Sequence, residues 1–231
     1  GVPGVPAAAE DCGTARDIAL AEAYQVPIHI CHVSSRTSVA MIRDAKRRGV
    51  QVTAETAPHY FSLTDAMLRA RDADFRMSPP LRTESDRLAV IEGLRDGTID
   101  AIATDHAPHT PAEKADFSKA PNGSIGMETS LAAGITYLVK TGLLTLRELL
   151  RLMSTAPANL LHIPAGTLNP GAPADIVLFD PDKSRTVSAS ILHSPVDWSP
   201  FDGMRLYGFA TMTLSHGETL IDHGMLCGER G

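Results

Sequence analysis

The pattern of apolar and polar positions predicts helices and short buried strands that alternate along the first hundred residues. Compact apolar runs predict strands near 28–33, 51–56, 74–77 and 100–104, and apolar residues at helical spacing predict helices near 7–24, 39–48, 65–70 and 84–96. The connections between the strands are too long for hairpins. We therefore expect four parallel strands covered by helices, either as an open sheet or as half of a (β/α)8 barrel.

The pattern changes after Asp105. A long loop that contains Pro and Gly runs to about Gly126, and helices are expected near 128–140 and 145–161. Beyond residue 166, short β-like runs are separated by Gly, Pro and Asp turns. We predict an α/β fold, with half of a TIM-type barrel over 1–165 and a segment of a small β domain over 166–231.

Composition and charge exclude several classes of function. The chain has 231 residues and a net charge of −6, without the clustered basic residues that nucleic-acid binding needs. Three cysteines at no metal-like spacing indicate a reducing compartment, and no apolar run is long enough to span a membrane. We expect a soluble, cytoplasmic protein. Because Gly1–Pro6 has the composition of a loop and lacks a Met, we expect the chain to be part of a longer one.

Polar, chemically capable residues follow the predicted strands. His32, His59, Ser78 and Asp105 each stand where one of these strands ends. In a barrel the catalytic groups come from the carboxyl ends of several strands. Imidazole and carboxylate groups bind Zn²⁺ and similar ions, so His32, His59 and Asp105 are candidate metal ligands. The pattern alone leaves open the alternative that they are structural residues held by hydrogen bonds.

The segment Thr104–His109 concentrates this chemistry. An aspartate directly after a buried strand is followed by two histidines, His106 and His109, and by a turn that contains Pro108. The aspartate could instead cap the turn by accepting hydrogen bonds from the next amides. Two imidazoles within four residues favour a functional site.

Several linked motifs resemble those of dihydroorotases. The signature loop of that family is similar to Thr104–His109, Glu113–Lys114, Ala120–Gly123 and Gly126–Glu128. Its motifs at strands five, six and seven resemble His29–Ser35, Glu55–Tyr60 and Ser78–Arg82, and its closing β segment resembles Pro195, Phe201–Gly203 and the tail from Gly208 to Gly224. The resemblance covers essentially all 231 residues and assigns the predicted strands to positions five to eight of the barrel.

The resemblance implies a role for each candidate residue. His32 and His59 would bind the second ion of a two-metal site, with zinc the expected metal. Asp105 would bind the first ion and act as general base and acid. The implied reaction is the reversible conversion of dihydroorotate to N-carbamoyl-L-aspartate, in the synthesis of pyrimidines. The substrate would be held by residues of the signature loop and by a serine that replaces the family's asparagine, namely His109, Asn122, Gly123 and Ser78.

Two departures from the family pattern bear on activity. The His-x-His pair of the first strand and the bridging carboxylate of the fourth strand are absent from this chain, so we expect it to need the N-terminal half of the same protein. Ser78 is shorter than asparagine and lacks its paired donor and acceptor.

Two alternatives to a dihydroorotase stay open. Hydantoinases and allantoinases share the barrel and the metal-binding aspartate. A non-catalytic scaffold for aspartate transcarbamoylase is the other alternative, although such homologues usually lose the ligands retained here. A homodimer is a further possible assembly.

Overall fold

The computed structural model describes residues 4–227 of the 231-residue chain. It forms two compact units: one runs up to Met127 and includes Ser188–Asp202, and the other comprises Glu128–Val187 with the residues from Gly203 onward. These two units do not coincide with the domains predicted over 1–165 and 166–231. The predicted domain boundary stays a prediction.

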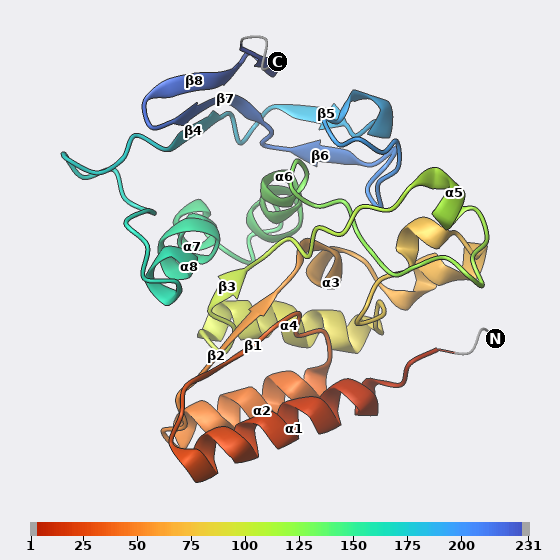
Figure 1. Cartoon of the computed structure of the whole chain (residues 1–231), viewed down its shortest axis with the longest axis vertical. Helices are drawn as coiled ribbons and strands as arrows, with labels where there is room; N and C mark the ends of the chain where they lie inside the picture. Colours follow the sequence, from red (N-terminus) through yellow and green to blue (C-terminus); the bar gives the residue numbers. More distant parts are fainter. Residues whose placement is uncertain (1–3, 228–231) are drawn as a thin grey trace. The chain divides into compact units, whose positions relative to one another are not determined.

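A parallel sheet forms the centre of the first unit (Figure 1). Its strands are β1 (Ile28–Ile30), β2 (Val52–Thr56) and β3 (Ala101–Ile102), in the order β1-β2-β3. The parallel register pairs Ile28 with Val52 and Glu55 with Ala101. Three of the four predicted strands are thus confirmed as parallel neighbours.

The predicted strand over 74–77 is wrong. Ala73–Phe75 is instead a short 3-10 turn, η2, whose N-cap Asp72 accepts a hydrogen bond from the amide of Asp74 at 3.0 Å. The residues that follow include Pro79 and Pro80, which have no amide hydrogen to donate to a strand ladder.

Helices cover the sheet at the positions predicted from apolar spacing. They are α1 (Ala7–Tyr24), α2 (Arg36–Arg47) and α4 (Glu84–Asp96), and Figure 1 shows α1 and α2 side by side. Ser35 caps α2 by accepting from the amide of Ser38 at 3.0 Å. Gly93 lets α4 pack closely, because a Cβ there would lie only 3.1 Å from Ile99 Cδ1 and 3.2 Å from Val39 Cγ1.

Short helical turns complete the first unit. Two of them, α3 (Pro58–Ser62) and η1 (Asp65–Ala70), follow β2 along the chain. The other two are α5 (Pro111–Lys114), in the long loop after β3, and η5 (Ala189–Ile191). The helix α3 begins directly after β2, which places His59 on a helix rather than at the strand end itself.

The second unit combines helices with antiparallel strands. Its helical segments are α6 (Ser130–Gly134), η3 (Ile135–Val139), α7 (Leu146–Leu150), η4 (Arg151–Thr155) and α8 (Ala156–Leu160), with η3 and η4 of π type. One sheet has the order β4-β7-β8-β9, formed by β4 (Ile176–Phe179), β7 (Ala210–Ser215), β8 (Glu218–Asp222) and β9 (Met225–Leu226). A separate pair joins β5 (Ser184–Thr186) to β6 (Arg205–Tyr207). The β-rich character predicted after residue 166 is confirmed. Within residues 4–227, no helix is both long and apolar enough to cross a membrane.

Candidate functional site

The three candidate ligands all follow parallel strands of the first unit. His32 comes two residues after β1, His59 is the second residue of α3 after β2, and Asp105 comes three residues after β3. The carboxyl ends of parallel strands meet at one edge of a sheet. His32 and Asp105 both adopt the left-handed region, with φ of 58° and 49°, which is uncommon for residues other than glycine and turns the chain sharply at both strand ends.

The structure brings these three side chains together. The Nε2 atom of His32 lies 3.5 Å from Asp105 Oδ1, and the Nε2 atom of His59 lies 3.9 Å from Asp105 Oδ2. One carboxylate therefore stands between two imidazole rings. Their convergence agrees with the sequence-based expectation, whereas their role as ligands stays a prediction.

Burial and contact with Glu55 shift the pKa values of this cluster. His59 is only 1% exposed and its Nε2 atom has no hydrogen-bond partner, so burial, with a further contribution from His32, lowers its pKa to about 3. His59 is thus neutral at physiological pH, the form in which imidazole binds metals. A hydrogen bond with Glu55 raises the pKa of His32, and burial raises the pKa of Asp105.

Glu55 is a member of the site to which the sequence analysis assigned no role, although it begins the motif Glu55–Tyr60. Its Oε1 atom accepts a hydrogen bond from the amide of His32 at 2.9 Å and lies 2.9 Å from His32 Nδ1. The side chain is on β2 and is almost fully buried. A charged residue inside an otherwise buried strand was the sequence signal that could have found it.

Glu55 also lies beside a second group of possible ligand atoms. His29, Cys31 and Glu55 each offer one possible ligand atom, and these three atoms lie within 4.8 Å of one another. The spacing of the cysteines in the sequence did not indicate such a group. Burial and the neighbouring Glu55 carboxylate raise the pKa of the Cys31 thiol. The His29 ring in turn hydrogen-bonds Thr53 through Nδ1 at 2.8 Å.

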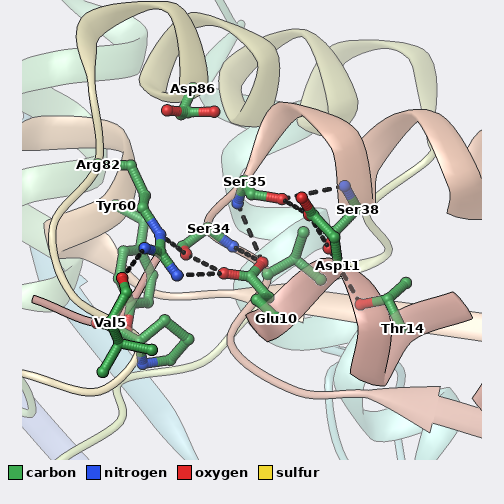
Figure 2. Close-up of polar contacts among 12 residues, drawn as sticks. Val5, Glu10, Asp11, Thr14, Ser34, Ser35, Ser38, Tyr60, Arg82 and Asp86 are labelled. Atoms are coloured by element: carbon green, nitrogen blue, oxygen red, sulfur yellow. Dashed lines mark hydrogen bonds and ion pairs between the residues drawn. The ribbon is translucent and has the colours of Figure 1, made fainter. Parts of the chain in front are cut away.

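A polar network fixes the segment that follows His32 (Figure 2). The Glu10 carboxylate on α1 accepts from the amide of Ser34 at 2.8 Å, from the amide of Ser35 at 3.0 Å and from the Ser34 hydroxyl. Arg82 pairs with the same carboxylate at 3.2 Å and donates to Ser34 Oγ at 3.2 Å. Both charged side chains are largely buried, so this network joins α1, the turn after β1 and the segment before α4.

The remaining candidate residues meet in the long loop after β3. His109 Nε2 lies 3.0 Å from the carbonyl oxygen of Asn122. At Gly123 a Cβ atom would lie 2.2 Å from the carbonyl oxygen of Ala107. Only glycine therefore permits the two halves of the loop to approach each other this closely. The loop also closes near its ends, where the Gly126 amide donates to His106 Nδ1 at 3.2 Å.

Ser78 lines the same cavity as a residue of this loop. Ser78 and Asn122 both line a space of about 640 Å³, together with the side chains of Arg71 and Arg76. The amide of Gly123 donates to the carbonyl oxygen of Arg76 at 2.9 Å, which attaches the loop to the segment that carries Ser78. The four predicted substrate-binding residues therefore lie on adjoining segments of the first unit.

Sequence relatives support the resemblance to dihydroorotases. The chain is 53% identical to the dihydroorotase of Syntrophus aciditrophicus over 218 residues, which covers 94% of this chain and 51% of that protein. It is 52% identical to the dihydroorotase of Geobacter metallireducens, with 95% of this chain and 52% of that protein covered. The chain thus spans about half the length of the curated relatives that it matches.

Solved structures with the same fold include a dihydropyrimidinase and a D-hydantoinase. The dihydropyrimidinase of Brevibacillus agri superposes with a TM-score of 0.92 at 32% identity and covers 96% of this chain and 50% of its own. A D-hydantoinase gives a TM-score of 0.92 at 29% identity, with 97% of this chain and 51% of its own covered. The family model of the amidohydrolase family matches residues 6–217. Since that match spans most of the 231 residues, the chain belongs to the amidohydrolase family.

Proposed function

We propose that the protein containing this chain is a dihydroorotase, which opens and closes the ring of dihydroorotate in pyrimidine biosynthesis. The observation that carries the proposal is the Asp105 carboxylate, placed between His32 Nε2 and His59 Nε2 at the carboxyl edge of a parallel sheet. Relatives named dihydroorotase at 52–53% identity support the choice of substrate.

The three side chains suit a divalent metal ion, which we propose to be zinc. His59 Nε2 is buried without a hydrogen-bond partner, a costly arrangement that a bound cation would relieve. Two imidazole nitrogens and a carboxylate oxygen form a donor set typical of zinc sites. His32 and His59 would hold one ion and Asp105 the other, with the remaining ligands supplied by the N-terminal half. Such ions polarise the scissile carbonyl and lower the pKa of the attacking water.

Asp105 would carry the proton during hydrolysis. When water attacks the ring carbonyl carbon, one proton passes from the water to a carboxylate oxygen of Asp105. As the carbon–nitrogen bond breaks, Asp105 would return that proton to the amide nitrogen, and the second proton of the water would leave the new carboxyl group for solvent, which gives the carboxylate of N-carbamoyl-L-aspartate. The close pairing of His32 with the buried Glu55 would keep His32 Nε2 directed at the same carboxylate.

The substrate would bind where the long loop meets the segment that carries Ser78. His109 and the backbone at Asn122 and Gly123 offer hydrogen-bonding groups, and Gly123 leaves room for the ring to approach the backbone. Ser78, which lines the adjoining cavity with Asn122, would contact the ring through its hydroxyl.

The architecture of the whole protein is part of this proposal. Residues 1–165 would supply the C-terminal half of a (β/α)8 barrel, to which β1, β2 and β3 contribute the parallel strands, and 166–231 a segment of a small β-sandwich domain. The N-terminal half would complete the barrel beside β1. A homodimer, or an assembly with aspartate transcarbamoylase, would be built on that complete protein.

A hydantoinase is the second candidate, because a solved D-hydantoinase shares the fold at a TM-score of 0.92. The test is a substrate panel with the full-length protein, comparing dihydroorotate, hydantoin, dihydrouracil and allantoin at equal concentrations. We expect dihydroorotate to have the highest kcat/KM by at least about 100-fold, which corresponds to roughly 2.8 kcal/mol of transition-state discrimination. A preference for hydantoin or dihydrouracil would favour the second candidate, and no turnover of any substrate would favour the scaffold.

A further inference from the structure

Lys114 is a buried lysine that none of the steps above uses. It ends the short helix α5 and is only 7% exposed, although lysine is almost never buried without partners. The helix itself is capped locally, since Thr110 and Glu113 form a reciprocal capping box. The capping box explains the turn of α5 and leaves the burial of Lys114 without an explanation.

Four backbone carbonyl groups surround the Lys114 ammonium. Its Nζ atom lies 2.9 Å from the oxygen of Ala73 and 3.3 Å from that of Arg76, on the segment that leads to Ser78. It lies 3.3 Å from the oxygen of Pro121 and 3.5 Å from that of Gly123, on either side of Asn122. One side chain thus connects two segments that are about 45 residues apart in the sequence and that both contribute to the proposed substrate pocket.

Trp198 extends this connection to His109. The Lys114 Nζ atom lies 4.4 Å from the centroid of the Trp198 ring, a distance at which a cation is attracted to the face of the ring. The indole Nε1 of Trp198 donates to the carbonyl oxygen of His109 at 2.6 Å. Trp198 is itself anchored in a buried apolar cluster with Ile125, Leu192 and Val196. Lys114 therefore contacts, directly or through one residue, every segment that carries a proposed substrate-binding residue.

We propose that Lys114 is a positioning residue that holds His109, Asn122, Gly123 and the Ser78 segment in the arrangement that binds the substrate. The ammonium group supplies three N–H donors to these carbonyls, in addition to the backbone amides that already donate to the oxygens of Ala73 and Arg76. Charged groups of neighbouring segments complete its surroundings: Asp72, Asp74 and Arg76. Lys114 does not touch the reacting atoms in this proposal, which rests on the proposed function for the identity of the substrate.

The test compares Lys114→Met with Lys119→Met in the full-length protein. Both substitutions remove one positive charge from the same loop, but the Lys119 side chain is 85% exposed and pairs with Asp116 at 3.7 Å. We expect Lys114→Met to raise KM for dihydroorotate at least about 10-fold, with kcat within about threefold and metal content unchanged, because uniform substrate binding is lost. Lys119→Met should match the wild type. Exchange of the Gly123 amide with deuterium should also accelerate in Lys114→Met alone.

A second variant covers the case in which Lys114→Met does not fold. Trp198→Phe keeps an aromatic ring in the apolar cluster and removes only the N–H donor to His109, so KM should again rise with kcat retained. The proposal is overturned if the wild type is active and folded Lys114→Met keeps the wild-type KM and the wild-type exchange rate of the Gly123 amide. If Lys114→Met does not fold, a wild-type KM in Trp198→Phe overturns it. If the wild type does not turn over dihydroorotate, the proposed function fails, and amide exchange alone decides whether Lys114 holds the loop.

Discussion

Replacing Glu55 with Gln tests whether a buried carboxylate prepares His32 to bind a metal ion. Glu55 Oε1 lies 2.9 Å from both the amide nitrogen and the Nδ1 atom of His32. The nearby carboxylate favours a proton on Nδ1, so that Nε2 keeps its lone pair and faces Asp105 at 3.5 Å. Glutamine has nearly the same size, but it carries no charge and presents a donor at one of its two terminal positions.

The expected effect is a weaker metal site in an intact fold. Loss of a carboxylate that orients a metal-binding histidine typically lowers metal affinity about 10- to 100-fold. That range corresponds to roughly 1.4–2.8 kcal/mol of binding free energy. The other two proposed ligands keep their side chains, so we expect a reduced affinity rather than the loss of the site.

The measurement is competition for Zn²⁺ between the metal-free full-length protein and a chromophoric chelator at fixed pH. Circular dichroism checks that the fold is retained. Glu22→Gln is the matched control, because Glu22 lies on α1 in a half-exposed ion pair with Arg48. A Glu55→Gln protein that binds Zn²⁺ as tightly as the control would refute the orienting role of Glu55.

Three further predictions follow from the same structure. Asp105→Asn should lower kcat for dihydroorotate by at least ~10²-fold with the circular dichroism spectrum unchanged, and a variant with half the wild-type rate would place the base elsewhere. Residues 1–231 expressed alone should not turn over dihydroorotate, whereas co-expression with the N-terminal half should restore activity; turnover by the isolated chain would contradict the two-metal account. Because burial lowers the pKa of Lys114 from 10.5 to about 8, the unfolded chain binds more protons between these two pH values. Its contribution to the free energy of unfolding should therefore rise from pH 8 to 10.5 in urea titrations, and the rise should be absent in Lys114→Met.

Much of the first unit could be predicted because its signals are local. Apolar spacing, Ser35 at a helix start and Gly97 at a helix end mark α2 and α4 without knowledge of tertiary contacts. The meeting of His32, His59 and Asp105 was predictable for a different reason. Parallel strands place their carboxyl ends at one edge, so residues far apart in sequence converge once the sheet is assumed.

The segment before Pro79 shows where local pattern fails. Phe75, Arg76 and Met77 have a composition that suits a strand, but a ladder requires amide donors and a neighbouring strand with free acceptors. In the structure β2 pairs directly with β3, and the carbonyl oxygen of Arg76 instead accepts from Gly123. Competition between possible partners decides this segment, and a single sequence contains no measure of that competition.

The roles of Glu55 and Lys114 were hidden for a related reason. Each is a charged residue whose partners lie far away in sequence: 23 residues separate Glu55 from His32, and 41 separate Lys114 from Ala73. Their burial is visible only after the fold has formed. A charged residue within an otherwise apolar strand, or within a long loop, was the available signal, and that signal does not identify the partner.

The most direct test of the central claim measures turnover of dihydroorotate by the full-length protein before metal removal, after removal by a chelator and after addition of Zn²⁺. The account predicts activity in the first state, its loss in the second and its recovery in the third, with close to two ions bound per chain when activity is full. A metal-free preparation that hydrolyses dihydroorotate at the full rate would contradict it.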